Sequence, residues 1–377
     1  MKGWVVVYIK YKNMPAITAW ASVVGKKESE GPLANLFGEC CQDDYFGKET
    51  WEQAETEMQS RCIKQLLHKK QISTNDIKLF MGGDLCNQIT STAFSMRDFG
   101  FPFLGLYNAC STMAESMIIS ACMVDAGYAD NSIAMASSHF CTAERQYRTP
   151  LDYGGKRTPT AQWTVTGCGS VLIEPVGKIA FIDSAQIGAV VDLGVTDTNN
   201  MGAAMAPAAA DTIKKFLKNS KTKASDYDLI VTGDLGAVGS GLLKELLEKE
   251  NISLDNHFDC GLEIYSEEQH VQSGASGCGC SASVLTSKLL PEFEEGKLNN
   301  ILFIATGALL SPSTSMQGES IPCIAHLVNI KSKKEVRKWV TFGHLLLADW
   351  FVLLDNFFWI WQNLHRQEFW LHLLWAV

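Results

Sequence analysis

The sequence predicts an α/β protein in which helices cover a core sheet, built from two long units of the same order. Segments with helical spacing alternate along the chain with short apolar runs that end in glycine or in small polar residues. This alternation is typical of α/β folds. The order of segments between 51 and 138 recurs between 208 and 308, which indicates an internal duplication.

The first unit begins with a helical pattern at 51–70, whose opposite face is strongly polar. The apolar run at 77–85 ends in glycines and predicts a strand followed by a turn. A strand at 101–107 then leads into a helix at 109–129, for which Gly127 is the expected stop. A buried strand at 131–138 closes the unit.

The second unit repeats these features. The run "YDLIVTGDL" at 227–235 matches "IKLFMGGDL" at 77–85, so that Asp234 corresponds to Asp84. A helical segment at 208–220 precedes it, and 274–308 echoes 105–138. We therefore predict an N-terminal half at 1–180, a C-terminal half at 181–337 and an atypical segment at 338–377.

That last segment is rich in tryptophan and phenylalanine and carries few charges. It has no uncharged apolar run long enough to span a membrane. Two interpretations stay open, an interfacial helix and an artefact of translation or gene fusion. The N-terminal run "MKGWVVVYIKYKNMP" is too short for a signal peptide, so we expect a cytoplasmic protein that is not secreted.

Composition excludes several function classes. The formal net charge is −9 and no long basic run occurs, which argues against binding of nucleic acid. The 12 cysteines are scattered, as expected for reduced thiols rather than a disulfide framework. The "CGC" at 278–280 lacks the paired spacing of a zinc site, so we expect no metal. The "GGD" and "GSG" runs lack full phosphate-loop spacing, and we expect no cofactor.

Cys110 is the residue on which the function depends, because it lies between a predicted strand and a predicted helix. Free N–H groups and the helix dipole at such a position favour a thiolate and would stabilise an oxyanion. Three interpretations follow: a nucleophile, the floor of a binding pocket, or a core residue.

A duplicated α/β unit with a cysteine before a helix resembles the thiolase-like fold. The runs "NACSTMAES", "SSHFCTAERQYRTPLDYGG", "MGAAMAPAAADTIK", "TGALLSP" and "ESIPCIAH" more closely resemble the stage V sporulation protein AD family, over about 14–330. The resemblance implies mostly parallel sheets with helices packed between them. It also implies binding of dipicolinic acid (pyridine-2,6-dicarboxylate) or its calcium chelate, and a role in moving it into the developing spore.

The resemblance further implies partners and a place in the cell. We expect a homodimer formed through the first half, lying on the cytoplasmic face of the inner spore membrane as a peripheral protein. Integral membrane proteins of the same spore channel complex are the implied partners.

The sequence departs from the related condensing enzymes at two positions. Those enzymes place a histidine after a strand and a histidine or asparagine in a glycine-flanked turn. Here the first position falls at Gly233 and the second near Cys278. We therefore expect a protein that binds without catalysis. An acyltransferase that uses Cys110, and a scaffold that organises a membrane channel, are the alternatives.

The candidate ligand-binding residues are those that could meet a small aromatic dianion. N–H groups at the helix start can bind a carboxylate, and arginines offer a matching fork. The candidates are Cys110, Ser111, Thr112, His139, Arg145, Arg148 and His326. For the histidines a satisfied place in the core is the alternative, and for the arginines a salt-bridge cluster with Glu144.

Overall fold

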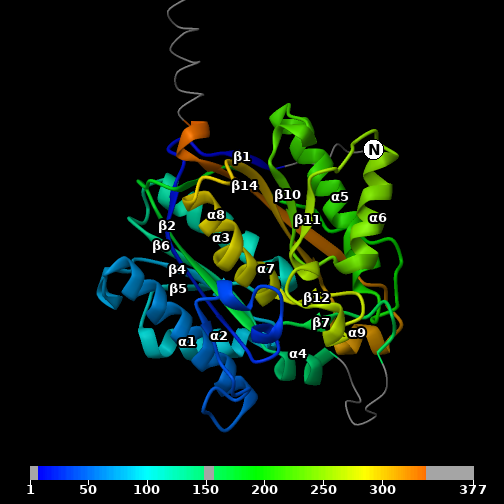
Figure 1. The fold of residues 1–377 in the computed structure, drawn as a ribbon, viewed down its shortest axis with the longest axis horizontal. Helices are drawn as coiled ribbons and strands as arrows, with labels where there is room; N and C mark the ends of the chain where they lie inside the picture. The colour runs from blue at the N-terminus through cyan, green and yellow to red at the C-terminus, as the bar shows by residue number, and fades with distance from the viewer. Residues whose placement is uncertain (1–6, 148–156, 337–377) are drawn as a thin grey trace, which may run out of the picture. The chain divides into compact units, whose positions relative to one another are not determined.

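The computed structural model describes residues 7–147 and 157–336 (Figure 1). Met1–Ser332 forms one compact unit, and Lys333–Val377 forms a second. The predicted tryptophan-rich segment at 338–377 lies outside the described residues, as does Arg148. Among the helices of the described ranges, none combines the length and the hydropathy needed to cross a bilayer.

The first half of the compact unit contains nine main elements. They are β2 (Ala16–Val24), α1 (Trp51–Lys70), β4 (Phe80–Gly83), α2 (Thr90–Phe99), β5 (Phe103–Gly105), α3 (Thr112–Asp125), β6 (Ser132–Ser138), α4 (Phe140–Tyr147) and β8 (Gly167–Glu174).

The second half repeats most of this order. Its elements are β9 (Ala180–Gln186), α5 (Met201–Ser220), β10 (Leu229–Thr232), α6 (Gly236–Glu248), β11 (His257–Asp259), α7 (Cys278–Val284), α8 (Leu290–Glu294), β13 (Asn300–Ala308), α9 (Pro312–Met316) and β14 (Cys323–Ser332). Short strands flank the main ones: β1 (Tyr8–Lys10) pairs with β9, β3 (Glu39–Cys40) pairs with β2, and β7 (Trp163–Thr164) pairs with β12 (Ala275–Ser276).

The strand order demonstrates the duplication. The first half is ordered β5-β4-β6-β8-β2 and the second β11-β10-β13-β14-β9, so the same succession is used twice. In each half only β8 or its counterpart β14 runs against the other strands. The two sets meet where β9 pairs antiparallel with β2. The predicted α/β fold with mostly parallel strands is confirmed.

Helices form three layers around the two strand sets. Helices α1 and α2 cover the outer face of the first set, while α5 and α6 cover the outer face of the second. Helices α3 and α7 lie between the sets, and α3 contacts strands of both halves. Figure 1 shows α3, α7 and α8 in this central position.

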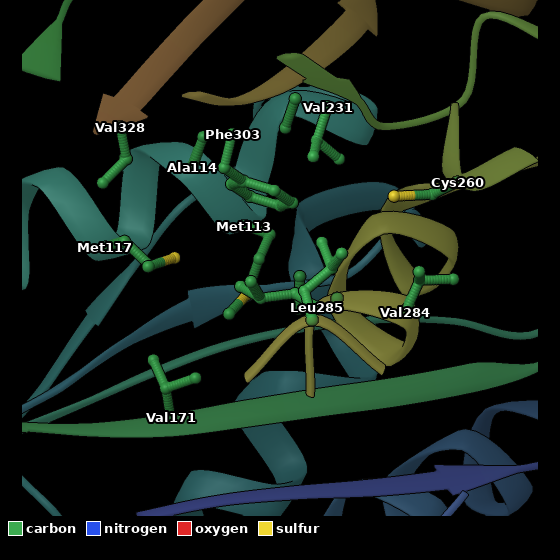
Figure 2. Packing of buried hydrophobic residues seen from close by; sticks show 14 of the residues in the cluster. Met113, Ala114, Met117, Val171, Val231, Cys260, Val284, Leu285, Phe303 and Val328 are labelled. Atoms are coloured by element: carbon green, nitrogen blue, oxygen red, sulfur yellow. The ribbon is translucent and has the colours of Figure 1, made fainter. Parts of the chain in front are cut away.

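Alternation along the strands explains the layers. On β13, Ile301 and Phe303 belong to the central apolar cluster, whereas Leu302 and Ile304 belong to the cluster under α5. Such alternation follows from the two-residue period of a strand, and both faces are apolar because both are covered. Figure 2 shows the central cluster, in which Met113 and Met117 of α3 face Val171, Leu285 and Phe303.

Glycines let α7 approach β8 closely. A Cβ atom on Gly279 would lie 2.2 Å from the carbonyl oxygen of Gly167, and one on Gly169 would lie 2.1 Å from that of Ala282. Side chains at these positions would force the helix away from the strand. The "CGC" at 278–280 is therefore a packing feature, and it fixes where α7 begins.

The elements predicted from the sequence are present, with shifted bounds. The helix at 51–70 is α1 with unchanged bounds, but the helix at 208–220 begins earlier, at Met201. Pro207 lies inside it, and a proline normally argues against continuing a helix. The helix at 109–129 is a 3-10 turn, η5 (Ala109–Ser111), followed by α3.

Candidate functional site

Cys110 lies in a constrained turn at the start of α3. Ala109 has φ +49°, in the left-handed region that residues other than glycine rarely adopt. The Ser111 Oγ donates to the Asn108 carbonyl oxygen (2.6 Å), and the Thr112 Oγ1 donates to that of Ala109 (2.7 Å). The hydroxyls of Ser111 and Thr112, two residues predicted to offer N–H groups to a ligand, thus close the turn that contains Cys110.

The charged group beside the Cys110 thiol comes from the other half of the chain. It is the carboxylate of Asp234, which lies close enough to raise the pKa of the thiol. The same carboxylate accepts from the Gly277 N–H (3.0 Å), the Thr306 Oγ1 (3.0 Å) and the Ser276 Oγ (3.3 Å). Asp234 therefore joins the start of α3, the start of α7 and strand β13 at one point.

Burial keeps this thiol protonated. Desolvation raises the pKa of Cys110 well above its usual value, and the nearby Asp234 and Cys278 raise it further. The Gly277 N–H acts in the opposite direction. Burial also raises the pKa of Asp234 to about 6, against the hydrogen bonds that it accepts. At neutral pH the pair is a thiol facing a carboxylate.

His326 reaches the same turn through Asn108. Its Nε2 lies 2.9 Å from the Asn108 amide nitrogen, and its Nδ1 accepts from the Gly188 N–H (3.2 Å). Burial lowers the pKa of His326 to about 4, so the ring is neutral at pH 7. Both ring nitrogens have partners other than Cys110, and His326 holds the turn from strand β14.

His139 lies in a different place, at the start of α4. It lines a cavity of about 290 Å³, the His139 cavity, together with Lys26, Lys27, Glu28, Glu30, Asp44, Phe140, Cys141, Trp163 and Thr166. The ring Nε2 hydrogen-bonds the Asp44 carbonyl oxygen (2.8 Å), and Nδ1 accepts from the Cys141 N–H (3.2 Å). Burial lowers the pKa of His139. The His139 ring is therefore neutral, lines the cavity, and holds the loop that contains Asp44.

Aromatic rings and cations gather beside this cavity. Phe140 and Trp163 stack with ring centroids 4.3 Å apart. The Lys27 ammonium lies 4.5 Å from the Trp163 ring centre, and the Arg157 guanidinium lies 4.4 Å from it. Arg157 also forms an ion pair with the buried Glu144 (3.0 Å). Positive charge and flat aromatic surface therefore lie beside the cavity, and the arginine that lies there is Arg157 rather than the predicted Arg145.

Helix α4 runs from the His139 cavity toward Cys110. It starts at Phe140 and ends at Tyr147, whose hydroxyl lies 3.1 Å from that of Tyr107. Burial, the Tyr107 hydroxyl, and proximity to Cys110 and Cys278 raise the pKa of Tyr147. An eight-residue helix is about 12 Å long, so α4 separates the cavity from the Cys110 turn by only that length.

The predicted site residues thus lie at three separate places in the structure. Cys110, Ser111, Thr112 and His326 meet at the turn, and His139 lines the cavity. Arg145 is instead half-exposed on α4, where it pairs with Glu52 of α1.

The sequence analysis missed one residue of the Cys110 turn, Asn108, and three residues beside the His139 cavity, which are Lys27, Arg157 and Trp163. It noted Asp234 only as a marker of the repeat. The repeated "GDL" was the available signal for Asp234, because it placed an acid at a strand end in both halves.

The start of α7 also has a buried cysteine near acidic residues of the other half of the chain. The Cys278 thiol donates to the Ser137 carbonyl oxygen (2.8 Å) and lies near Glu55 and Asp84. Ligand atoms of Glu55, Asp84 and Cys86 all lie within 4.8 Å of one another, and all three residues are buried.

Hydrogen bonds within the protein already serve both of these carboxylates. Glu55 accepts from the Ser137 Oγ (2.8 Å) and the Thr142 Oγ1 (3.0 Å), while Asp84 accepts from the Thr92 and Cys86 N–H groups. Burial, then the charge of Asp84, raises the pKa of Glu55 to about 8. At neutral pH Glu55 therefore holds a proton.

Comparisons with known proteins agree with the fold and identify the family. The family model for stage V sporulation protein AD matches residues 7–331. Stage V sporulation protein AD of Bacillus subtilis (strain 168) is 43% identical over 311 residues, covering 82% of this chain and 92% of that protein.

Solved structures share the fold at low identity. The 3-oxoacyl-[acyl-carrier-protein] synthase III of Aquifex aeolicus VF5 gives a TM-score of 0.53 at 14% identity, over 84% of this chain and 99% of that one. An OleA protein of Xanthomonas campestris gives 0.55 at 12% identity, over 86% and 100%. The fold is therefore thiolase-like. From the family match and the identity to the Bacillus subtilis protein, the chain belongs to the stage V sporulation protein AD family.

Proposed function

We propose that this sporulation protein binds dipicolinic acid, or its calcium chelate, without chemical turnover, and serves the uptake of that compound into the developing spore. The observation that carries the proposal is the burial of the Cys110 thiol beside the Asp234 carboxylate. A thiol with a raised pKa is a poor nucleophile. The ring nitrogens of His139 and His326 already have other partners.

Groups that suit a flat dianion line the His139 cavity at the start of α4, where Glu28, Glu30 and Asp44 also lie. Lys26 and Lys27 line the His139 cavity, with the stacked Phe140 and Trp163 beside them. Such a combination of cations and aromatic surface suits a ring that carries two carboxylates. At the other end of α4, Asp234 would repel a carboxylate unless it is protonated. Because its pKa is raised to about 6, we expect a ligand placed there to take up a proton on binding.

Calorimetric titration of the full chain with pyridine-2,6-dicarboxylate, with and without calcium, tests this proposal. We expect saturable binding that weakens at least ten-fold in Cys110→Ala if the ligand sits at the turn, or in Lys27→Met if it sits in the His139 cavity. Cys122→Ala and Lys78→Met are the matched controls. If titration with the dicarboxylate gave no heat and an acyl-CoA labelled Cys110 covalently, the protein would instead be an acyltransferase that uses Cys110. No response in either assay would favour the scaffold.

The cellular setting is part of the same proposal. We place the protein on the cytoplasmic face of the inner spore membrane, as a peripheral homodimer with integral membrane partners. Strand β5 lies at the end of the sheet, and Leu104 (51% exposed) and Tyr107 (49% exposed) stand on or beside it. An exposed edge with apolar side chains suits pairing with a second copy. Light scattering measures the molar mass in solution. We expect a dimer for the wild type and a monomer for Leu104→Lys.

A further inference from the structure

A groove of about 700 Å³ lies at the end of α5, in the second half of the chain. None of the residues that line it belongs to the Cys110 turn or the His139 cavity. They are Lys214, Leu217, Lys218, Thr222, Lys223, Ala224, Ser225, Tyr227, Asn251, Ile252, Ser253, Asp255 and Asn256. We call it the lysine groove. One wall is the last turn of α5 with the residues after it, and the other is the connection from α6 to β11.

Positive charge is concentrated here on an otherwise acidic protein. Residues 214–223 contain five lysines and no acid, while the whole chain has a net charge of −9. Lys214 pairs with Glu250 and Lys215 with Asp211. Within the described ranges, the other three lysines form no ion pair. They are exposed, and they are Lys218, Lys221 and Lys223.

The fold itself uses only some of these cations. A lysine in the last turn of a helix is stabilised by the helix dipole, which accounts for Lys218. Lys221 and Lys223 follow the end of α5 at Ser220, and Lys221 is the left-handed cap residue. Their charges therefore have no evident role in holding the helix.

The duplication provides an internal comparison. Helix α5 has Lys218 in its last turn, whereas the corresponding helix α1 ends in Lys69 and Lys70. There, Lys70 forms an ion pair with Glu174, and the Lys69 ammonium donates to the Trp20 carbonyl oxygen (3.3 Å). In the first half, both lysines at the end of α1 therefore contact strands of the sheet that the helix covers. In the second half the equivalent end faces an open groove.

The shape of the groove decides which anion fits it. Leu217 and Tyr227 are buried beneath it, and Ile252 is half-buried, so the floor is partly apolar. Asp255 is the acidic residue among those that line it. A flat anionic surface would meet only the lysines at the rim. An extended chain can enter, place apolar atoms on the floor and pair its carboxylates with the rim.

We propose that the lysine groove binds an extended acidic peptide segment of a partner protein. Charge complementarity of this kind sets specificity and association rate, and it weakens with salt. The partner segment should carry several aspartates or glutamates, interspersed with apolar side chains that reach Leu217 and Ile252.

Fluorescence anisotropy of the full chain with a labelled decapeptide of alternating glutamate and leucine tests the proposal. We expect saturable binding that weakens at least ten-fold in Lys218→Glu/Lys223→Glu, and that weakens again when salt is raised. Lys64→Glu/Lys78→Glu makes the same charge change on exposed lysines of the first half and should leave binding within two-fold. Ile252→Ser should weaken peptide binding while thermal melting shows a folded protein.

Three results would overturn the proposal. The first is the absence of peptide binding by the wild type, and the second is an equal loss of binding in both lysine pairs. The third is binding of phosphatidylglycerol vesicles that depends on Lys218 and Lys223 but not on Ile252, which would assign the lysines to a lipid surface.

Discussion

The Cys110 thiol and the Asp234 carboxylate come from opposite halves of a duplicated chain and lie beside each other in its interior. The counterpart of Asp234 in the first half, Asp84, lies near Cys278, the cysteine at the start of α7. Each helix start therefore faces an aspartate of the other half. The two differ because Asp84 has a second buried carboxyl, Glu55, beside it.

The first prediction concerns the reactivity of Cys110. Asp234→Asn removes the negative charge that raises the pKa of the thiol, so the thiolate fraction should increase. We expect iodoacetamide to label Cys110 about three- to ten-fold faster at pH 8, since labelling follows the thiolate. Mass spectrometry of the labelled peptide measures the rate, with Cys122 as the internal reference. Asp84→Asn should leave the Cys110 rate unchanged, and equal rates in wild type and Asp234→Asn would contradict the assignment.

The second prediction concerns His326 and acid. Its pKa of about 4 in the folded state lies below the usual 6.5, so between these values only the unfolded chain takes up the proton. The free energy of unfolding should therefore fall as the pH drops from 6.5 toward 4. Between pH 7 and pH 5 this contributes about 2 kcal/mol.

His326→Gln should remove that part of the pH dependence. Urea unfolding at pH 7 and pH 5 gives the difference directly. His68→Gln, on the exposed face of α1, is the control and should keep the wild-type dependence. If His326→Gln lost as much stability as the wild type between the two pH values, the ring would have to be charged in the folded protein.

Much of the fold could be predicted from the sequence because it depends on periodicity. The apolar alternation of the strands and the helix at 51–70 were visible as patterns, and the repeated "GDL" revealed the duplication. The site was harder, because its contacts join residues far apart in the chain. Nothing near Cys110 in the sequence indicates that Asp234 lies beside its thiol.

The arginines show the same limit. Arg145 follows His139 closely, so sequence proximity suggested a common ligand clamp. Helix geometry instead directs Arg145 toward Glu52 on α1. Arg157 takes the place beside Phe140 and Trp163.

The third prediction concerns the buried Glu28. Its carboxylate accepts from the Tyr265 hydroxyl and the Thr166 N–H, yet burial raises its pKa to about 7. The folded protein therefore holds a proton that the unfolded chain releases near pH 4.5. The stabilisation is fully present below that value and is lost as the pH rises to 7.

Glu28→Gln should remove this loss, because the amide resembles the protonated acid. Between pH 5 and pH 7.5 the wild type should lose about 2 to 3 kcal/mol more than the variant. Thermal or urea melts at the two pH values measure it. Glu30→Gln, an exposed neighbour, should behave as wild type. A parallel pH response in Glu28→Gln would mean that Glu28 is ionised throughout.

The fourth prediction concerns Gly307 of β13, which lies against the Cys110 turn. A Cβ atom there would lie 2.6 Å from the Asn108 carbonyl oxygen and 3.2 Å from the Ser111 nitrogen. Because Asn108 carries the contact to His326, Gly307→Ala should push the turn away from β13. We expect a loss of about 1 to 3 kcal/mol in stability and faster labelling of Cys110 as the turn loosens.

Gly241→Ala is the matched control for this change. Gly241 lies inside α6, and a Cβ atom there meets no atom within 4 Å. Alanine should therefore stabilise the helix by about 0.5 to 1 kcal/mol and leave Cys110 labelling unaltered. If Gly307→Ala were as stable as the wild type and Cys110 kept its labelling rate, β13 would not support the turn. The position of Cys110 would then have to depend on Asp234 and Gly277 alone.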